Sequence, residues 1–144
     1  MKNFLELRDT KLQIDVGLII DREANAVPPD VVLRCNKFGW QGALGKQRTF
    51  SWQIDLLEPV TIEIMLHKKN YNRDPQTAVH LLSVRFDDFE LLPDYAHHAS
   101  YDNDHGWDEP TNYLGFNGIW RFQTNEPFYT WYHRISGQGW LLKP

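Results

Sequence analysis

The sequence lacks several features that would point to a familiar class of protein. Its 144 residues contain one cysteine, so no internal disulfide can hold the fold together. No run of Lys and Arg appears and the formal net charge is -4, which argues against nucleic-acid binding through bulk electrostatics. No apolar run approaches the ~20 residues that span a bilayer, and no apolar segment marks a signal peptide. We therefore expect a soluble protein of the cytoplasm or of a virion, with neither membrane nor nucleic acid as a partner.

Common catalytic motifs are missing as well. The chain has no Gly-x-Ser-x-Gly elbow, phosphate-binding loop, Cys-x-x-Cys pair or dinucleotide fingerprint. The single thiol, Cys35, lies in an apolar segment without a partner that would activate it, and we expect it to be buried or half-buried. On these grounds we assign no catalytic residue and favour a protein that is not an enzyme.

The apolar residues, by contrast, are abundant and regularly spaced. Hydrophobic residues make up 42% of the chain, which suits one domain with its own core over residues 1–144. Residues 11–20 and 49–56 alternate between apolar and polar positions, the period of a half-buried strand. Further short strands are expected at 5–7, 31–35, 61–67, 78–86, 89–92, 113–122 and 138–144.

Several finer features of these strands can also be predicted. The segments 49–56 and 61–67 are separated by Glu58-Pro59 and are expected to be antiparallel neighbours. The strand at 78–86 has apolar residues at both odd and even positions, which indicates burial on both faces. The glycine-rich segment 36–46 is expected to form turns.

One segment near the C-terminus has helical spacing instead. Phe128, Trp131, Tyr132 and Ile135 recur at i, i+3, i+4 and i+7, with Asn125 as N-cap and a glycine after the last turn. Many short strands, one short helix and no alternation of strands with helices predict an all-β, two-sheet antiparallel sandwich. Its topology is expected to be jelly-roll-like.

The most polar and aromatic stretch, Tyr95–Trp107, is expected to be a loop that carries the functional site. Four carboxylates lie within eight residues, beside an asparagine and a glycine. Because hard cations prefer several oxygen ligands from one short loop, this cluster is a candidate Ca²⁺ site. A turn in which these side chains cap local backbone groups is the alternative. The candidate metal ligands are Asp102, Asp104, Asp108 and Glu109.

The same stretch also suits sugar recognition. Flat aromatic rings stack on the apolar faces of sugars, while carboxylates and amides bind the hydroxyl groups. We therefore take Tyr101, Asn103 and Trp107 as candidate ligand-binding residues, together with Trp40 from the glycine-rich segment. Trp40 has an alternative role, which is to close the end of the sandwich.

The cluster Tyr101-Asp-Asn-Asp104, followed by Tyr113-Leu-Gly-Phe-Asn-Gly-Ile-Trp120, resembles calcium-dependent carbohydrate-binding sandwiches. This resemblance covers about twenty residues and implies a non-catalytic module that binds a glycan, with Ca²⁺ as its cofactor. The end of the chain from Trp131 also resembles small uncharacterised proteins of marine phage.

Two other hypotheses remain open. A structural or assembly protein, such as a phage virion component or a homo-oligomer, would use the aromatic residues of the C-terminal third as its interface with a protein partner. A small metal-dependent enzyme would use His97, His98 or His105 with nearby carboxylates.

Overall fold

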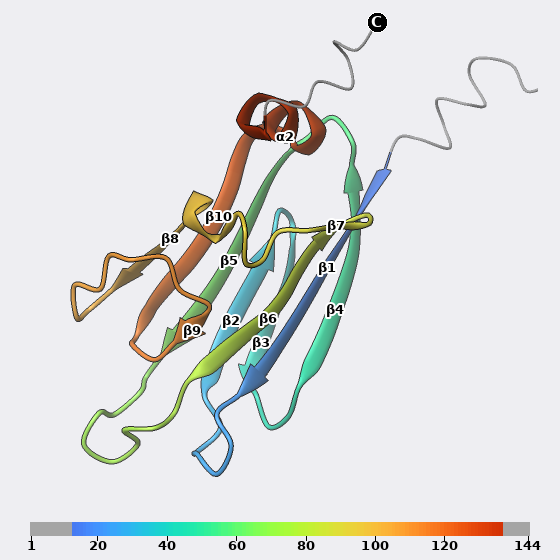
Figure 1. Cartoon of the computed structure of the whole chain (residues 1–144). Helices are drawn as coiled ribbons and strands as arrows, with labels where there is room; N and C mark the ends of the chain where they lie inside the picture. The colour runs from blue at the N-terminus through green and yellow to red at the C-terminus, as the bar shows by residue number, and fades with distance from the viewer. Residues whose placement is uncertain (1–12, 137–144) are drawn as a thin grey trace, which may run out of the picture.

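The structure, a computed structural model, describes residues 13–136 and is a sandwich of two antiparallel β-sheets with one C-terminal helix (Figure 1). The first sheet has the strand order β4-β1-β6-β7, and β9 pairs with β6 beyond the end of β7. Its strands are β1 (Gln13–Arg22), β4 (Arg48–Asp55), β6 (Val79–Phe86), β7 (Phe89–Glu90) and β9 (Tyr113–Leu114).

The second sheet has the order β3-β2-β5-β10-β8, so β8 lies at one edge and pairs with β10 alone. Its strands are β2 (Asp30–Cys35), β3 (Phe38–Ala43), β5 (Pro59–His67), β8 (Ala99–Asn103) and β10 (Gly118–Pro127). A short 3-10 helix, η1 (Ala96–His98), precedes β8, and α2 (Phe128–Ser136) follows β10.

The strand order is jelly-roll-like, as the sequence predicts. A jelly roll places its first strand beside its last and its second strand beside the one before the last. Here β9 lies beside β6 and β10 lies beside β5. If β9 and β10 are taken as the first and second strands of a jelly roll, β1 to β6 follow as its third to eighth strands in the usual order. The two strands that open an ordinary jelly roll therefore come at the end of this sandwich.

The core lies between the two sheets. It is formed mainly by alternating residues of β1, β2, β5, β6 and β10, with Trp120 and Phe122 among the largest buried side chains. The alternation predicted for the first strand is confirmed, because Ile14, Val16 and Leu18 are at most 1% exposed. Cys35 is buried as expected, and its burial raises the pKa of the thiol to about 12.

The prediction that 78–86 is buried on both faces is wrong. The register between β1 and β6 shifts between Ile19 and Ile20, so Ile19 pairs with Ser83 while Ile20 pairs with Leu81. This bulge changes the phase of the strand and brings Leu81 and Val84 to the same core. Leu82, in the bulge, is 48% exposed.

The predicted pairing of residues 49–56 with 61–67 is also wrong. β4 pairs with β1 in the first sheet, whereas β5 pairs with β2 and β10 in the second sheet. The turn between them, in which Asp55 accepts a hydrogen bond from the Leu57 backbone at 2.8 Å, carries the chain from one sheet to the other. Alternation shows which face of a strand is buried, but it does not identify the neighbouring strand.

Two other segments differ from the prediction. The glycine-rich segment contains the strand β3, which pairs with β2 after a tight turn at Asn36, where φ is 51°. Glycine is tolerated there because β3 is an edge strand with one neighbour. The single strand predicted at 113–122 is two strands, since β9 belongs to the first sheet and β10 to the second.

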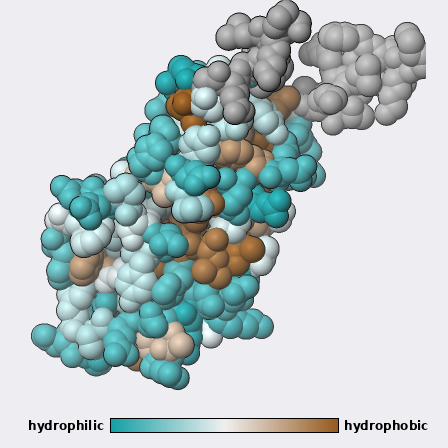
Figure 2. Space-filling view, viewed as in Figure 1, coloured by the Kyte–Doolittle hydropathy of each residue, from teal (hydrophilic) through white to brown (hydrophobic). Residues whose placement is uncertain are grey.

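The predicted helix is confirmed as α2, although it begins at Phe128 because β10 continues through Pro127. Phe128 and Trp131 are buried under it. The strands predicted at 5–7 and 138–144, and the capping glycine, lie outside the described residues. No helix in the described part of the chain is long and apolar enough to cross a membrane. The face shown in Figure 2 is mostly hydrophilic, with a small apolar patch near its centre.

Candidate functional site

The candidate site is an open groove along the edge strand β8, with a volume of about 600 Å³. One wall is β8 itself, and the other is formed by the loop 104–112 that leaves β8 and leads to β9 (left of Figure 1). The predicted functional stretch is therefore only partly a loop, because residues 96–103 form η1 and β8. The lining residues are His97, Ala99, Ser100, Tyr101, Asp102, Asn103, Gly106, Trp107, Asp108, Glu109 and Pro110.

Asn103, the last residue of β8, fixes the shape of the loop. Its Nδ2 donates to the carbonyl oxygens of Tyr101 at 2.9 Å and Trp107 at 2.8 Å. Its Oδ1 accepts from the backbone N–H groups of His105 at 3.0 Å and Trp107 at 3.1 Å. The amide thus uses both donors and both acceptor positions on the backbone. Its role in the structure is to hold the loop against the strand.

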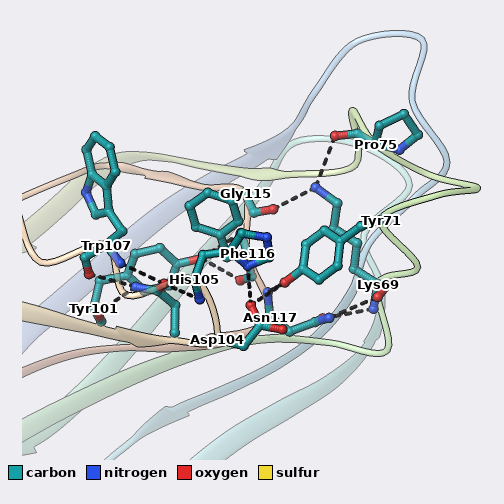
Figure 3. Close-up of polar contacts among 11 residues, drawn as sticks. Lys69, Tyr71, Pro75, Tyr101, Asp104, His105, Trp107, Gly115, Phe116 and Asn117 are labelled. Carbon is teal, nitrogen blue, oxygen red and sulfur yellow. Dashed lines mark hydrogen bonds and ion pairs between the residues drawn. The ribbon is translucent and has the colours of Figure 1, made fainter.

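Trp107 presents an aromatic surface at the groove. Its side chain is 45% exposed, which places it among the large hydrophobic residues that face solvent. The indole Nε1 donates to the carbonyl oxygen of Glu109 at 3.0 Å, so the orientation of the ring is fixed. In Figure 3 the ring stands apart from the other side chains of the loop. An exposed and oriented indole next to a groove is a suitable stacking surface.

Three of the four predicted metal ligands line the groove. Asp102, Asp108 and Glu109 are exposed, and within residues 13–136 their carboxylates form no ion pair and no hydrogen bond. Asp102 lies on β8, opposite Ile119 of β10, whereas the other two lie on the loop. The carboxylates are therefore available to a ligand from both walls of the groove.

Asp104, the fourth predicted ligand, faces away from the groove and holds the loop from behind (Figure 3). Its Oδ1 accepts hydrogen bonds from the Tyr71 hydroxyl at 2.5 Å and lies 2.7 Å from His105 Nδ1. The Tyr71 hydroxyl in turn accepts from the backbone N–H of Asn117 at 2.8 Å. The hydrogen bond from Tyr71, followed by His105, lowers the pKa of Asp104 below its usual value. We call Tyr71, Asp104 and His105 the latch.

Aromatic packing completes the latch. The His105 ring stacks on Phe116 at 4.2 Å between centroids and meets the edge of Tyr71 at 4.4 Å. The Tyr101 hydroxyl donates to the Phe116 carbonyl oxygen at 2.5 Å and accepts from its N–H at 2.9 Å. Burial raises the pKa of Tyr101 to about 12. The hydroxyl of this predicted ligand-binding residue is therefore engaged with the backbone, while the residue lines the groove.

Lys69 and Asn117 hold the loop that carries Tyr71 in place. The Asn117 amide forms two hydrogen bonds with the Lys69 backbone, to its N–H at 2.8 Å and to its carbonyl oxygen at 2.9 Å. Lys69 Nζ donates to the carbonyl oxygens of Gly115 at 2.6 Å and Pro75 at 3.2 Å. Burial lowers the pKa of this ammonium group. Loop 68–78 is thereby tied to the segment between β9 and β10.

The remaining predicted site residues lie elsewhere. Trp40 is on β3, the opposite edge of the second sheet from β8, where it packs on Phe50 at 5.4 Å with the Arg48 guanidinium 4.6 Å above its ring. The His98 ring meets Trp131 of α2 in a T-shaped contact at 5.2 Å between centroids, and His105 belongs to the latch. Within residues 13–136, no group of three His, Cys, Asp or Glu side chains is arranged to hold a metal ion.

Sequence reasoning missed Tyr71, which lies in a segment that reads as an ordinary polar loop. The only signal was one aromatic residue between charged and amide side chains, and nothing in the sequence relates it to Asp104.

No protein-family model matches this chain, and none of the curated proteins matches it either.

Proposed function

We propose that the protein is a non-catalytic binding module and that its ligand is a carbohydrate held in the β8 groove. The observation that carries this proposal is the combination of the exposed, oriented Trp107 ring with three carboxylates along one groove that have no partner among residues 13–136. An indole stacks on the apolar face of a sugar ring, and carboxylates accept hydrogen bonds from its hydroxyl groups. An open groove of about 600 Å³ admits a few sugar units of a longer chain.

The hydrogen bonds already made by the backbone of β8 favour a sugar as the ligand over an added peptide strand. Strand addition needs free backbone groups along the edge of a sheet. The N–H of Ala99 already bonds to Ala96, and the carbonyl oxygen of Tyr101 already accepts from the Asn103 side chain. A peptide strand would compete with both contacts, whereas a ligand bound through side chains leaves them in place.

The exposure of the groove carboxylates favours binding over hydrolysis. Glycosidases use two facing carboxyl groups, and the one that acts as the acid usually lies in an apolar pocket. Asp102, Asp108 and Glu109 are all exposed. Ca²⁺ is an optional part of the proposal, since binding by Trp107 and the carboxylates requires no ion.

A substitution of Trp107 tests the proposal directly. Immobilised glycans should retain the wild-type protein, and Trp107→Ala should abolish the retention while leaving the melting temperature close to that of the wild type. Trp40→Ala is the matched control, because it removes an indole from the opposite edge of the same sheet. Retention that survives Trp107→Ala, or that disappears in both variants, would contradict this site.

The assembly hypothesis receives less support from the structure. Trp120, Phe122, Phe128 and Trp131, which belong to the aromatic C-terminal third, are at most 4% exposed. Because they fill the core, they offer no surface to a partner. Assembly through other residues remains a prediction that a size-exclusion mass well above 17.0 kDa would support.

A further inference from the structure

We propose that the carbohydrate bound in the β8 groove is cationic, with unacetylated amino sugars as the recognised units. This inference rests on the proposed function and adds the chemical class of the ligand. It follows from three properties of the groove, which are its charge, its aromatic surface and the hydrogen bonds that its neutral polar groups already make.

The first property is the charge of the lining residues. Asp102, Asp108 and Glu109 contribute three carboxylates from both walls, and neither Lys nor Arg is among the residues that line the groove. His97 is the one basic side chain there, and its ring packs against His98 at 4.2 Å between centroids. Charges of one sign along a groove create a potential that attracts the opposite charge. A sulfated or uronic acid glycan would be repelled, whereas a glycan with ammonium groups would be attracted.

The second property is the aromatic surface. The face of an indole attracts a cation within about 6 Å of its centre, in addition to stacking on apolar groups. Trp107 is 45% exposed and lies between Gly106 and Asp108. A sugar that stacks on this ring can place an amino substituent near the Asp108 and Glu109 carboxylates. The aromatic surface and the charge therefore favour the same ligand.

The third property is the state of the neutral polar groups. Amides and hydroxyls are the usual partners of neutral or acetylated sugars, yet the Asn103 amide makes four hydrogen bonds to the backbone. The Tyr101 hydroxyl is likewise engaged with the backbone of Phe116. Among the described lining side chains, this leaves the three carboxylates, the Ser100 hydroxyl and the His97 ring, so carboxylates form the majority of the polar groups that can select between ligands. Carboxylates select for donors, and most strongly for charged donors.

Calorimetry with three oligosaccharides of equal length tests the inference. They are built from glucosamine, from N-acetylglucosamine and from a uronic acid. Titrations are made at mildly acidic pH, where the amines are protonated, and at low salt. We expect glucosamine to bind about tenfold or more tightly than its acetylated form, and the uronate to bind most weakly. Raising the salt towards 1 M, where the Debye length falls to about 3 Å, should reduce the preference.

Variants locate the effect. Asp108→Asn/Glu109→Gln should remove most of the preference for glucosamine, while Trp107→Ala should weaken both glucosamine and N-acetylglucosamine. Asp88→Asn/Glu58→Gln is the charge-matched control, because these exposed carboxylates lie outside the groove, and it should keep the preference. Melting curves confirm that each variant is folded.

The outcomes separate the two proposals. Equal binding of the acetylated and free amines, tighter binding of the uronate, or loss of preference in the control variant overturns the cationic ligand and leaves a glycan module in place. If none of the three oligosaccharides binds, both the glycan proposal and this inference fail.

Discussion

The hydroxyl of Tyr71 donates a hydrogen bond to Asp104 Oδ1 at 2.5 Å, although the two residues are 33 positions apart in the chain. Tyr71 lies in the loop between β5 and β6, and Asp104 begins the loop that forms one wall of the groove. Both sheets are thereby connected to the candidate site, because β5 belongs to the second sheet and β6 to the first. The geometry of the groove depends on residues that do not line it.

Removal of the Tyr71 hydroxyl should loosen this loop. Tyr71→Phe loses the contacts to Asp104 and to the Asn117 N–H, and we expect unfolding to require about 1 kcal/mol less free energy. If binding then has to order the loop, ligand affinity falls by about 2- to 10-fold. Tyr129→Phe is the matched control, since it removes a similar bond to Asp87 at 2.5 Å outside the groove. Equal losses of affinity in the two variants would argue against a role of the latch.

The lowered pKa of Asp104 predicts that the free energy of unfolding depends on pH in the acidic range. Because its pKa is lower in the folded than in the unfolded protein, this carboxylate stabilises the fold above its unfolded pKa of about 3.9. That contribution is lost as the pH falls through the lower, folded pKa. Urea unfolding across this pH range should give a shallower decline of stability for Asp104→Asn than for the wild type. Parallel declines would contradict the prediction.

Gly118 is required for the pairing of β8 with β10. A Cβ atom there would lie 2.2 Å from the Asp102 carbonyl oxygen and 2.7 Å from the Asn103 Cα, so the strands would have to separate. We expect Gly118→Ala to reduce the free energy of unfolding by about 1–3 kcal/mol and to weaken ligand binding. Gly45→Ala is the control, because its Cβ would meet no heavy atom within 4 Å. Denaturant melts of the two variants give the comparison.

A thermal melt with excess Ca²⁺, repeated with a chelator, tests the predicted ion. Asp104 is engaged by Tyr71 and His105, which leaves three of the four predicted ligands accessible in the groove. We therefore expect no clear shift of the melting temperature. A ligand present at about 100 times its Kd would add about 2.7 kcal/mol. A shift of that size, lost in Asp108→Asn/Glu109→Gln, would place Ca²⁺ in the groove.

The fold could largely be predicted where one local pattern decides the structure. Alternation in β1 depends on which face meets the core, and the spacing of Phe128 and Trp131 follows from a helix packed on one side. Partners across the sandwich could not be predicted, because β4 and β5 have the same alternation whether they pair or belong to different sheets. The bulge at Leu82 could not be predicted either. One inserted residue in a strand with a single buried face gives the same apolar pattern as a strand that is buried on both faces.

The site was predicted in part. The stretch around residues 101–109 does line a groove, because several polar and aromatic residues gather there within a few positions. Asp104 differs from Asp108 because it bonds to Tyr71, which is 33 positions away and which the local sequence does not relate to it. Trp40 illustrates the reverse case, in which a conspicuous residue of the sequence lies at the other edge of the sheet.

The strand order described above gives residues 87–112 a special position. They join β6 to β9, which correspond to the last and the first strand of an ordinary jelly roll. The sandwich is thus related to the common order by circular permutation, and this segment occupies the place where the common order has its two chain ends. The groove wall, β8 and η1 all belong to it. Substitutions and changes of length in this segment can therefore alter the groove while β1 to β6, β9 and β10 keep their pairing with one another.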